Sequence, residues 1–141
     1  ERNELKKYQL EFGISQLNNF NTMKIKRIEN SIYLKEHLSG LKNISFLNYA
    51  NHIDWNHQYF IIKINCDFKK FNKVIFKNGI HAMEENVWNC LDYGYSIVND
   101  KDNFNITKDN NEKILRIQNS SYLKKKHLDK IINIITKSVN V

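Results

Sequence analysis

The sequence contains 141 residues, carries a net charge of +7 and has no proline, and 41% of its residues are hydrophobic. This length fits a single domain or one lobe of a larger protein, with a core of modest size. No apolar run is long enough to cross a bilayer, so no membrane-spanning helix is predicted. The chain starts at Glu1 without the basic and apolar start of a secretory signal, so we expect a piece of a longer cytoplasmic protein.

Apolar residues near the start of the chain predict a long helix over residues 5–38, or two helices joined by a bend. They recur at gaps of three, four or simple multiples: Leu5, Tyr8, Phe12, Phe20, Met23, Ile28, Ile32 and Leu38. Because this spacing places them on one face, we expect that face to pack on the later strands and the last helix. Asparagines at 18–21 favour an interruption, after which Thr22 can cap a second segment that ends at Gly40.

The middle of the chain predicts a short strand, followed by two strands around a helix. Residues 41–47 indicate a turn and a short strand, and residues 58–65, rich in β-branched and aromatic side chains and apolar on both faces, indicate a central strand. Asp67 can cap a helix that runs to about Lys77, and Gly79 is the expected left-handed residue after it. A further strand is expected at residues 80–83.

The last third predicts a polar loop at residues 99–113, a strand at 114–117 and a closing helix. Ser120 or Ser121 is expected to open that helix. Its apolar face consists of Leu123, Leu128, Ile131, Ile132 and Ile135. Together the elements predict an α+β fold, with a small, mostly antiparallel sheet, helices packed on it and a long N-terminal helix.

Lysine supplies most of the positive charge, since only three of the 22 basic residues are arginines. A basic module that binds nucleic acid through its phosphates, or that binds another protein, is the alternative to an enzyme. Arginine makes the bidentate contacts that phosphate sites use, and the lysines are spread along the whole chain. The charge pattern therefore favours a biased composition over a nucleic-acid interface.

No motif predicts a metal, catalytic or cofactor-binding residue. His52, Asp54 and His57 lie within six residues of an expected loop and could be drawn as a metal-ligand cluster, but this spacing is common by chance. Cys66 and Cys90 lie far apart. The two cysteines lack a CxxC arrangement and are typical of reduced thiols in the cytosol. Glu84 and Glu85 are adjacent on an expected strand, where neighbouring side chains point to opposite faces, so they form a poor acid–base pair.

Residues 9–17, Q-L-E-F-G-I-S-Q-L, resemble a helix of the DegT-type sugar aminotransferases, which are pyridoxal-phosphate enzymes of fold type I. That helix reads close to Q-A-A-L-G-L-A-Q-L, and Gly13 fits it as a small residue where a helix packs closely. The resemblance continues in the family's order through the strand at 58–64, the helix that ends at Gly79 and Ile80, and residues 114–123. It covers nearly the whole chain.

The resemblance implies that residues 1–141 are the C-terminal small domain of such an enzyme, without its large cofactor-binding domain. In the family the large domain carries the imine-forming lysine, so we expect pyridoxal phosphate in the intact parent and none on this part. The implied parent is a homodimer that transfers an amino group to a nucleotide-linked keto-sugar in polysaccharide biosynthesis. This part alone is expected to be inert, with no catalytic or cofactor-binding residue.

Two segments depart from the family's pattern. Arg2 and Glu4 stand where the family has the Asn and Arg of N-Y-R-M, so those roles do not carry over. Residues 85–88 stand where the family has H-Y-P-P near the entrance of the active site. We therefore expect a different substrate pocket, with substrate contacts from Met83, Glu84, Glu85, Asn86 and Trp88.

Overall fold

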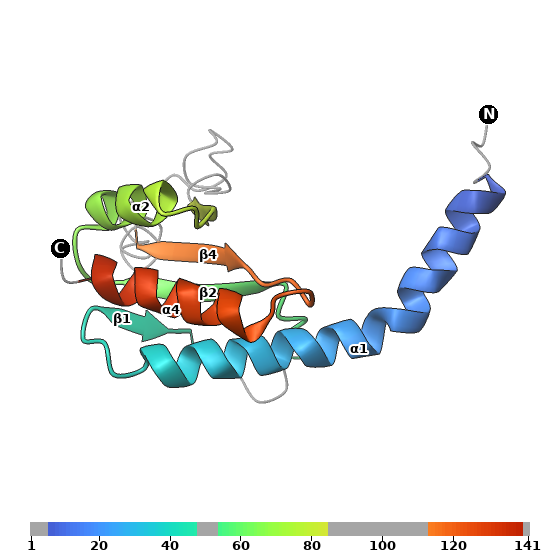
Figure 1. Ribbon diagram of the computed structural model, residues 1–141, viewed down its shortest axis with the longest axis horizontal. Helices are drawn as coiled ribbons and strands as arrows, with labels where there is room; N and C mark the ends of the chain where they lie inside the picture. The colour runs from blue at the N-terminus through green and yellow to red at the C-terminus, as the bar shows by residue number, and fades with distance from the viewer. Residues whose placement is uncertain (1–5, 48–53, 85–112, 140–141) are drawn as a thin grey trace, which may run out of the picture.

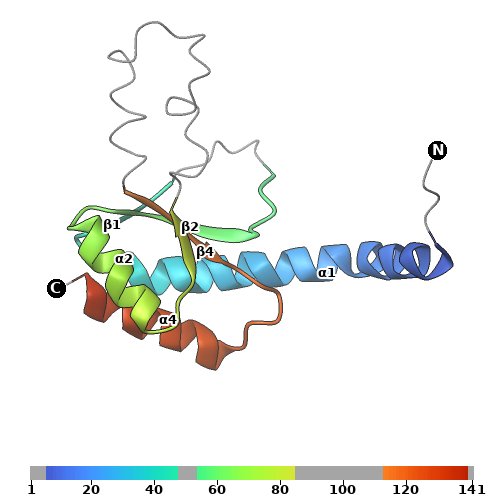
Figure 2. The same cartoon turned by 90° about the horizontal axis from the view of Figure 1, so that it is seen from above.

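The structure is a computed structural model that describes residues 6–47, 54–84 and 113–139. Its helices and strands follow one another as α1 (Lys7–Leu38), β1 (Ile44–Phe46), β2 (Tyr59–Ile64), α2 (Phe68–Lys77), β3 (Ala82–Glu84), β4 (Ile114–Gln118) and α4 (Lys125–Ser138). The strands form one antiparallel sheet in the order β1-β2-β4-β3. The described helices pack on one side of it (Figures 1 and 2). This confirms the α+β prediction and the central position of β2.

The core lies between the sheet and the helices. Along β2, Phe60, Ile62 and Ile64 are buried, whereas Tyr59, Ile61 and Lys63 between them are half-buried. Because alternate side chains of a strand point to opposite sides, one face of β2 lies in the core and the other face is partly covered. The helices supply the other half of the core: Leu34, Leu38, Phe71, Ile75, Leu128 and Ile135.

Helix α1 is continuous over 32 residues and bent near its middle (Figure 1). The expected break at residues 18–21 is wrong. Asn19 donates its side-chain amide to the backbone carbonyl of Ser15 at 2.9 Å, so it bonds within the helix and does not end it. Thr22 therefore lies inside a helix and caps nothing.

The expected packing of α1 on its own chain holds only near its C-terminal end. Its buried residues are Asn30, Ser31, Leu34 and Leu38. By contrast, the exposed fractions of Tyr8, Phe12 and Phe20 are 63%, 67% and 45%. The first half of α1 extends beyond the sheet and the other helices, as Figure 2 shows. We call residues 7–22 the projecting half and residues 23–38 the packed half.

The ends of α2 match the sequence. The Asp67 carboxylate accepts a hydrogen bond from the backbone N–H of Lys70 at 3.0 Å, and Gly79 adopts a φ of 83°. Strand β3 begins at Ala82 and not at Ile80, because the N–H of Ile80 donates to the carbonyl of Ile75 and completes the end of α2.

Helix α4 begins at Lys125, several residues later than expected. The hydroxyl of Ser120 accepts from the N–H of Tyr122, and the carbonyl of Ser120 accepts from the N–H of Leu123 and from the side chain of Asn30. Ser120 therefore shapes a turn against α1 and does not cap a helix. The expected apolar positions at Leu128 and Ile135 are buried in the core.

Candidate functional site

The expected substrate-contact segment begins on the edge strand β3. In the backbone register, Met83 lies opposite Arg116 and Glu84 lies opposite Leu115, both on β4. Glu85, Asn86 and Trp88 lie outside the described residues. The structure thus places the start of the segment beside the middle of β4, and its role in substrate binding stays a prediction.

A hollow lies beside the sheet strands β2 and β4. It has a volume of about 360 Å³, and its lining includes Trp55, Tyr59, Ile61 and Arg116. The guanidinium carbon of Arg116 lies 5.5 Å from the centre of the Tyr59 ring, which is the geometry of a cation–π contact. In the register, Ile61 of β2 and Met83 of β3 lie opposite Arg116 from the two sides of β4, so Arg116 lies between the hollow and the strand from which the expected segment starts.

Residues 54–57 are fastened to α1 just before β2. The Lys24 ammonium lies 2.6 Å from both carboxylate oxygens of Asp54. His57 adopts a φ of 52°, in the left-handed region that is unusual for a residue with a side chain. Burial and then the positive charge of Lys24 lower the pKa of His57 below its ordinary value of 6.5, and Asp54 partly opposes them. The ion pair with Lys24 gives Asp54 an ionic partner other than a metal.

The candidate metal ligands that lie among the described residues are Asp54, His57 and Cys66, and these three are not brought together. Within residues 6–47, 54–84 and 113–139, no three His, Cys, Asp or Glu side chains gather. Cys66 is a free thiol, and burial raises its pKa. His52 and Cys90 lie outside the described ranges.

A buried amide cluster joins α1 to the end of β4. The side-chain nitrogen of Asn119 lies 2.8 Å from the carbonyl oxygen of Arg27, 3.0 Å from the hydroxyl of Ser31 and 3.0 Å from the carbonyl oxygen of His57. Asn30 donates to the side-chain oxygen of Asn119 at 3.2 Å. Buried amides are costly when unpaired, so this cluster fixes where α1 crosses the sheet.

Sequence reasoning missed this amide cluster, although a signal for it exists. Asn30 and Ser31 occupy α1 one turn before Leu34, on the side that enters the core. A polar pair within a buried helical face predicts a partner of matching polarity. That partner, Asn119, directly follows the buried strand β4, but the sequence alone does not say which of its many asparagines is meant.

The projecting half of α1 presents apolar side chains in several directions. Leu10, Ile14 and Leu17 are 49%, 58% and 74% exposed, in addition to the exposed aromatic residues of this half. Gly13, expected to mark a close contact, has nothing within 4 Å of the position that a Cβ would take. Exposed apolar patches of this kind mark interaction surfaces.

Several solved structures have a fold similar to that of this chain. DesV from S. venezuelae, in complex with a ketimine intermediate, matches with a TM-score of 0.84 at 14% identity over 98% of this chain. PseC from Helicobacter pylori, an aminotransferase involved in the biosynthesis of pseudoaminic acid, matches with a TM-score of 0.79 at 17% identity over 97%. Spr1654 from Streptococcus pneumoniae, described as a sugar aminotransferase and solved in its PLP form, gives 0.71 at 14% identity over 91%. The chain has the fold of one part of a sugar aminotransferase.

The matches cover nearly all of this chain but only part of each solved chain. The chain covers 38% of DesV, 38% of PseC and 34% of Spr1654, so it spans little more than a third of the solved chains. At these identities the likeness concerns the fold. Scans of the sequence against protein-family models and curated proteins give no match. Among the described residues, no helix combines the length and apolarity needed to cross a membrane.

The described residues do not fit an imine-forming site for pyridoxal phosphate. Such a site needs a lysine whose amine is desolvated beside the cofactor. In the three described ranges no lysine is buried, and Lys24, Lys63 and Lys113 are half-buried. Lys24 is held by Asp54, and the other two also have interaction partners. Imine chemistry therefore has no candidate lysine among these residues.

Proposed function

We propose that the chain is the small C-terminal lobe of a pyridoxal-phosphate-dependent aminotransferase whose large domain holds the cofactor. The fold match carries this proposal, because it extends over nearly all of this chain and about a third of each solved enzyme. The order of the sequence motifs supports the same reading. The alternative, a free-standing basic module, gives no reason for an apolar helix that projects away from the sheet.

The projecting half of α1 is the proposed contact with the large domain. Helices that are apolar in several directions are found buried within larger proteins. Tyr8 and Leu10 lie on different sides of α1, because side chains two positions apart in the sequence are rotated by about 200° around a helix. A single flat partner would leave one of them exposed, so a surface that wraps around the helix is required.

The proposed substrate is a nucleotide-linked keto-sugar. This rests on the names of the matched proteins, among them an aminotransferase of pseudoaminic acid biosynthesis, and on the sequence resemblance. We place substrate contacts on the segment that starts at Met83 and Glu84 and continues through Glu85, Asn86 and Trp88. Beside its start, Arg116 supplies a fixed positive charge on β4 that suits an anionic substrate.

The proposed parent is a cytoplasmic homodimer, and the lobe alone is inert. An aminotransferase needs the cofactor imine, for which the described residues offer no lysine. Mixing the chain with pyridoxal phosphate, reducing with borohydride and mapping the modified lysines should show only sparse, non-stoichiometric labelling. A single lysine labelled to completion would contradict the proposal that the lobe is inert.

The membership of a larger enzyme is tested on the native polypeptide. Mass spectrometry of the protein from its source should show this sequence within a polypeptide nearly three times its length, given the coverage of 34–38%. That polypeptide should bind pyridoxal phosphate with the absorbance band of a protonated imine. A native chain confined to these 141 residues, stable and monomeric, would refute the proposal.

A further inference from the structure

Helices α2 and α4 gather lysines that lie far apart in the sequence. Each helix contains four lysines, and the two together contain a single acidic residue, Asp129. The two helices pack against each other and on the same side of the sheet (Figure 2). The fold therefore concentrates positive charge that is spread along the chain in the sequence.

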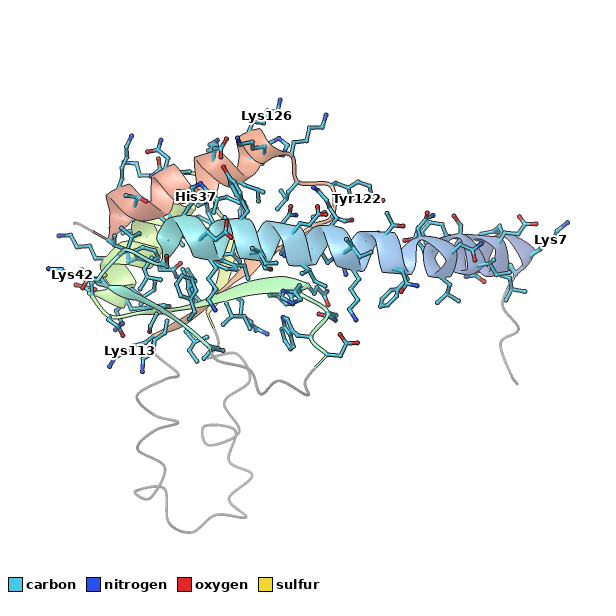
Figure 3. All side chains as sticks on the ribbon, turned by 90° about the horizontal axis from the view of Figure 1, so that it is seen from below. Lys7, His37, Lys42, Lys113, Tyr122 and Lys126 are labelled. Atoms are coloured by element: carbon cyan, nitrogen blue, oxygen red, sulfur yellow. The ribbon has the colours of Figure 1, made fainter. Side chains whose placement is uncertain are left out.

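Six of these lysines lie on the sides of α2 and α4 that face away from the core. Each stands two positions from a core residue of its helix, such as Phe71 or Leu128, and side chains two positions apart point to nearly opposite sides of a helix. All six are exposed, and Figure 3 shows Lys126 pointing away from α1 and the strands. We call this set the basic face: Lys69, Lys73, Lys77, Lys126, Lys130 and Lys137.

Acidic side chains do not balance the charge of the basic face. Helix α2 has no acidic residue, and Asp129 of α4 accepts a hydrogen bond from the hydroxyl of Tyr33 on α1 at 2.7 Å. Asp129 is thus directed toward α1. Within the described ranges, the ion pairs involve Lys7, Lys24 and Lys26 and none of the six lysines. The counter-charge for this face must come from outside the described residues.

Phe76 places an exposed aromatic ring on the same side of α2. It follows Lys69 by seven positions and Lys73 by three, which puts the three side chains on one face, and it is 61% exposed. The ring of His81 packs edge-on against it, with 5.2 Å between the ring centres. Lysines around a protruding apolar ring are typical of surfaces that lie in a membrane interface.

We propose that the basic face docks the protein on an anionic lipid bilayer, with Phe76 inserted at the level of the headgroups. Neither helix contains arginine, the residue suited to the bidentate contacts that nucleic-acid interfaces use. A lysine ammonium attracts anionic headgroups without a fixed geometry, and clusters of about four to eight basic residues are typical of such attachment. The charge and the exposed ring therefore fit a lipid surface better than a nucleic acid.

This proposal goes beyond the proposed function and does not rest on it. Helices α2 and α4 lie beside the packed half of α1, whereas the projecting half extends away from them (Figure 1). A large domain that encloses the projecting half would leave the basic face open.

Co-sedimentation of the full chain with lipid vesicles tests the proposal. Vesicles of phosphatidylcholine with about 30% phosphatidylserine should bind the chain at low salt and release it at about 0.5 M salt, because salt screens exposed charges. Vesicles of phosphatidylcholine alone should bind it at least about ten-fold more weakly. Absence of binding to the anionic vesicles would overturn the proposal. Equal binding to both kinds would also overturn it, because the exposed apolar side chains of the projecting half would then account for it.

Lysine variants with a matched control locate the binding surface. Lys73→Gln together with Lys77→Gln should weaken binding to the anionic vesicles at least about five-fold. Lys35→Gln together with Lys42→Gln removes the same charge outside the basic face and should leave binding within about two-fold. Lys35 points toward β1, with its ammonium 5.8 Å from the centre of the Phe46 ring, and Lys42 is exposed before β1. Equal losses in the two double variants would show a diffuse effect of net charge and overturn the proposal.

Phe76 variants separate a lipid surface from a nucleic acid. Phe76→Ala should weaken binding to the anionic vesicles about three-fold or more, whereas Phe76→Leu should retain it, because insertion needs an apolar side chain and not a ring. Stacking on a base needs the ring. Binding of a short polyuridine strand that Phe76→Leu weakens, with no binding to the vesicles, would refute the proposal. Unchanged helical circular dichroism shows that each variant is folded.

Discussion

The two halves of α1 belong to one helix but have opposite surroundings. In the packed half, Leu34 and Leu38 are fully buried and Asn30 is tied to Asn119. In the projecting half, Phe12 and Leu17 are more than 65% exposed although they are as apolar as the core. Helical periodicity is the same on both sides of the bend. The comparison shows that an apolar stripe on a helix predicts a contact but does not say whether the partner surface belongs to the same domain.

Truncating one leucine in each half of α1 should give the largest difference in stability between the two halves. Leu34→Ala should lower the free energy of unfolding by about 2–5 kcal/mol, because it leaves a cavity in the core. Leu17→Ala should change it by less than about 0.5 kcal/mol, because the side chain is already in water. Urea unfolding monitored by circular dichroism measures both.

A large loss of stability for Leu17→Ala in a monomeric sample would contradict the exposed state of the projecting half. If the sample self-associates, the same loss should fade on dilution, because the stability of an associated species depends on concentration. Sedimentation at two concentrations separates these cases.

The amide cluster should account for the next largest effect. Asn119→Ala removes a donor to the carbonyls of Arg27 and His57 and the acceptor of the Asn30 amide, and should cost about 1–3 kcal/mol. Asn30→Ala should cost less when Asn119 is already alanine, because the two amides share a hydrogen bond. A double-mutant cycle in urea measures this coupling, and strictly additive losses would show that the cluster does not act as a unit.

The difference between the halves also explains what the sequence could predict. The central strand, the Asp67 cap and the left-handed Gly79 follow from local residue preferences, and the structure has all three. Ser120 resembles a cap in the sequence, but its hydroxyl accepts from the N–H of Tyr122 in a turn, and its carbonyl accepts from Asn30, 90 residues away, so α4 begins later. The exposure of Phe12 and the pairing of Asn30 with Asn119 depend on distant surfaces, which a local pattern does not contain.

The pH dependence of the free energy of unfolding should report on His57. The carbonyl of His57 accepts a hydrogen bond from Asn119, which also binds the packed half of α1. The pKa of His57 in the folded state lies below the ordinary value of 6.5, so the unfolded chain binds more protons in that range. Stability should therefore fall as the pH drops below about 6.5 and level off below the folded pKa. His57→Asn tolerates the left-handed backbone and should flatten this part of the profile. An unchanged slope would exclude His57 as its source.

Gly13 should give the smallest effect and the sharpest view of the projecting half. A Cβ there meets nothing within 4 Å, and glycine weakens a helix interior by about 1 kcal/mol relative to alanine. Gly13→Ala should therefore raise the helical signal of the isolated chain slightly and leave global unfolding unchanged, because residues 7–22 can fray without opening the core. In the proposed full-length enzyme Gly13→Ala should instead be destabilising, because its methyl group would meet the surface of the large domain that encloses α1. A helix that gains from alanine in both settings would show that the projecting half is never closely covered.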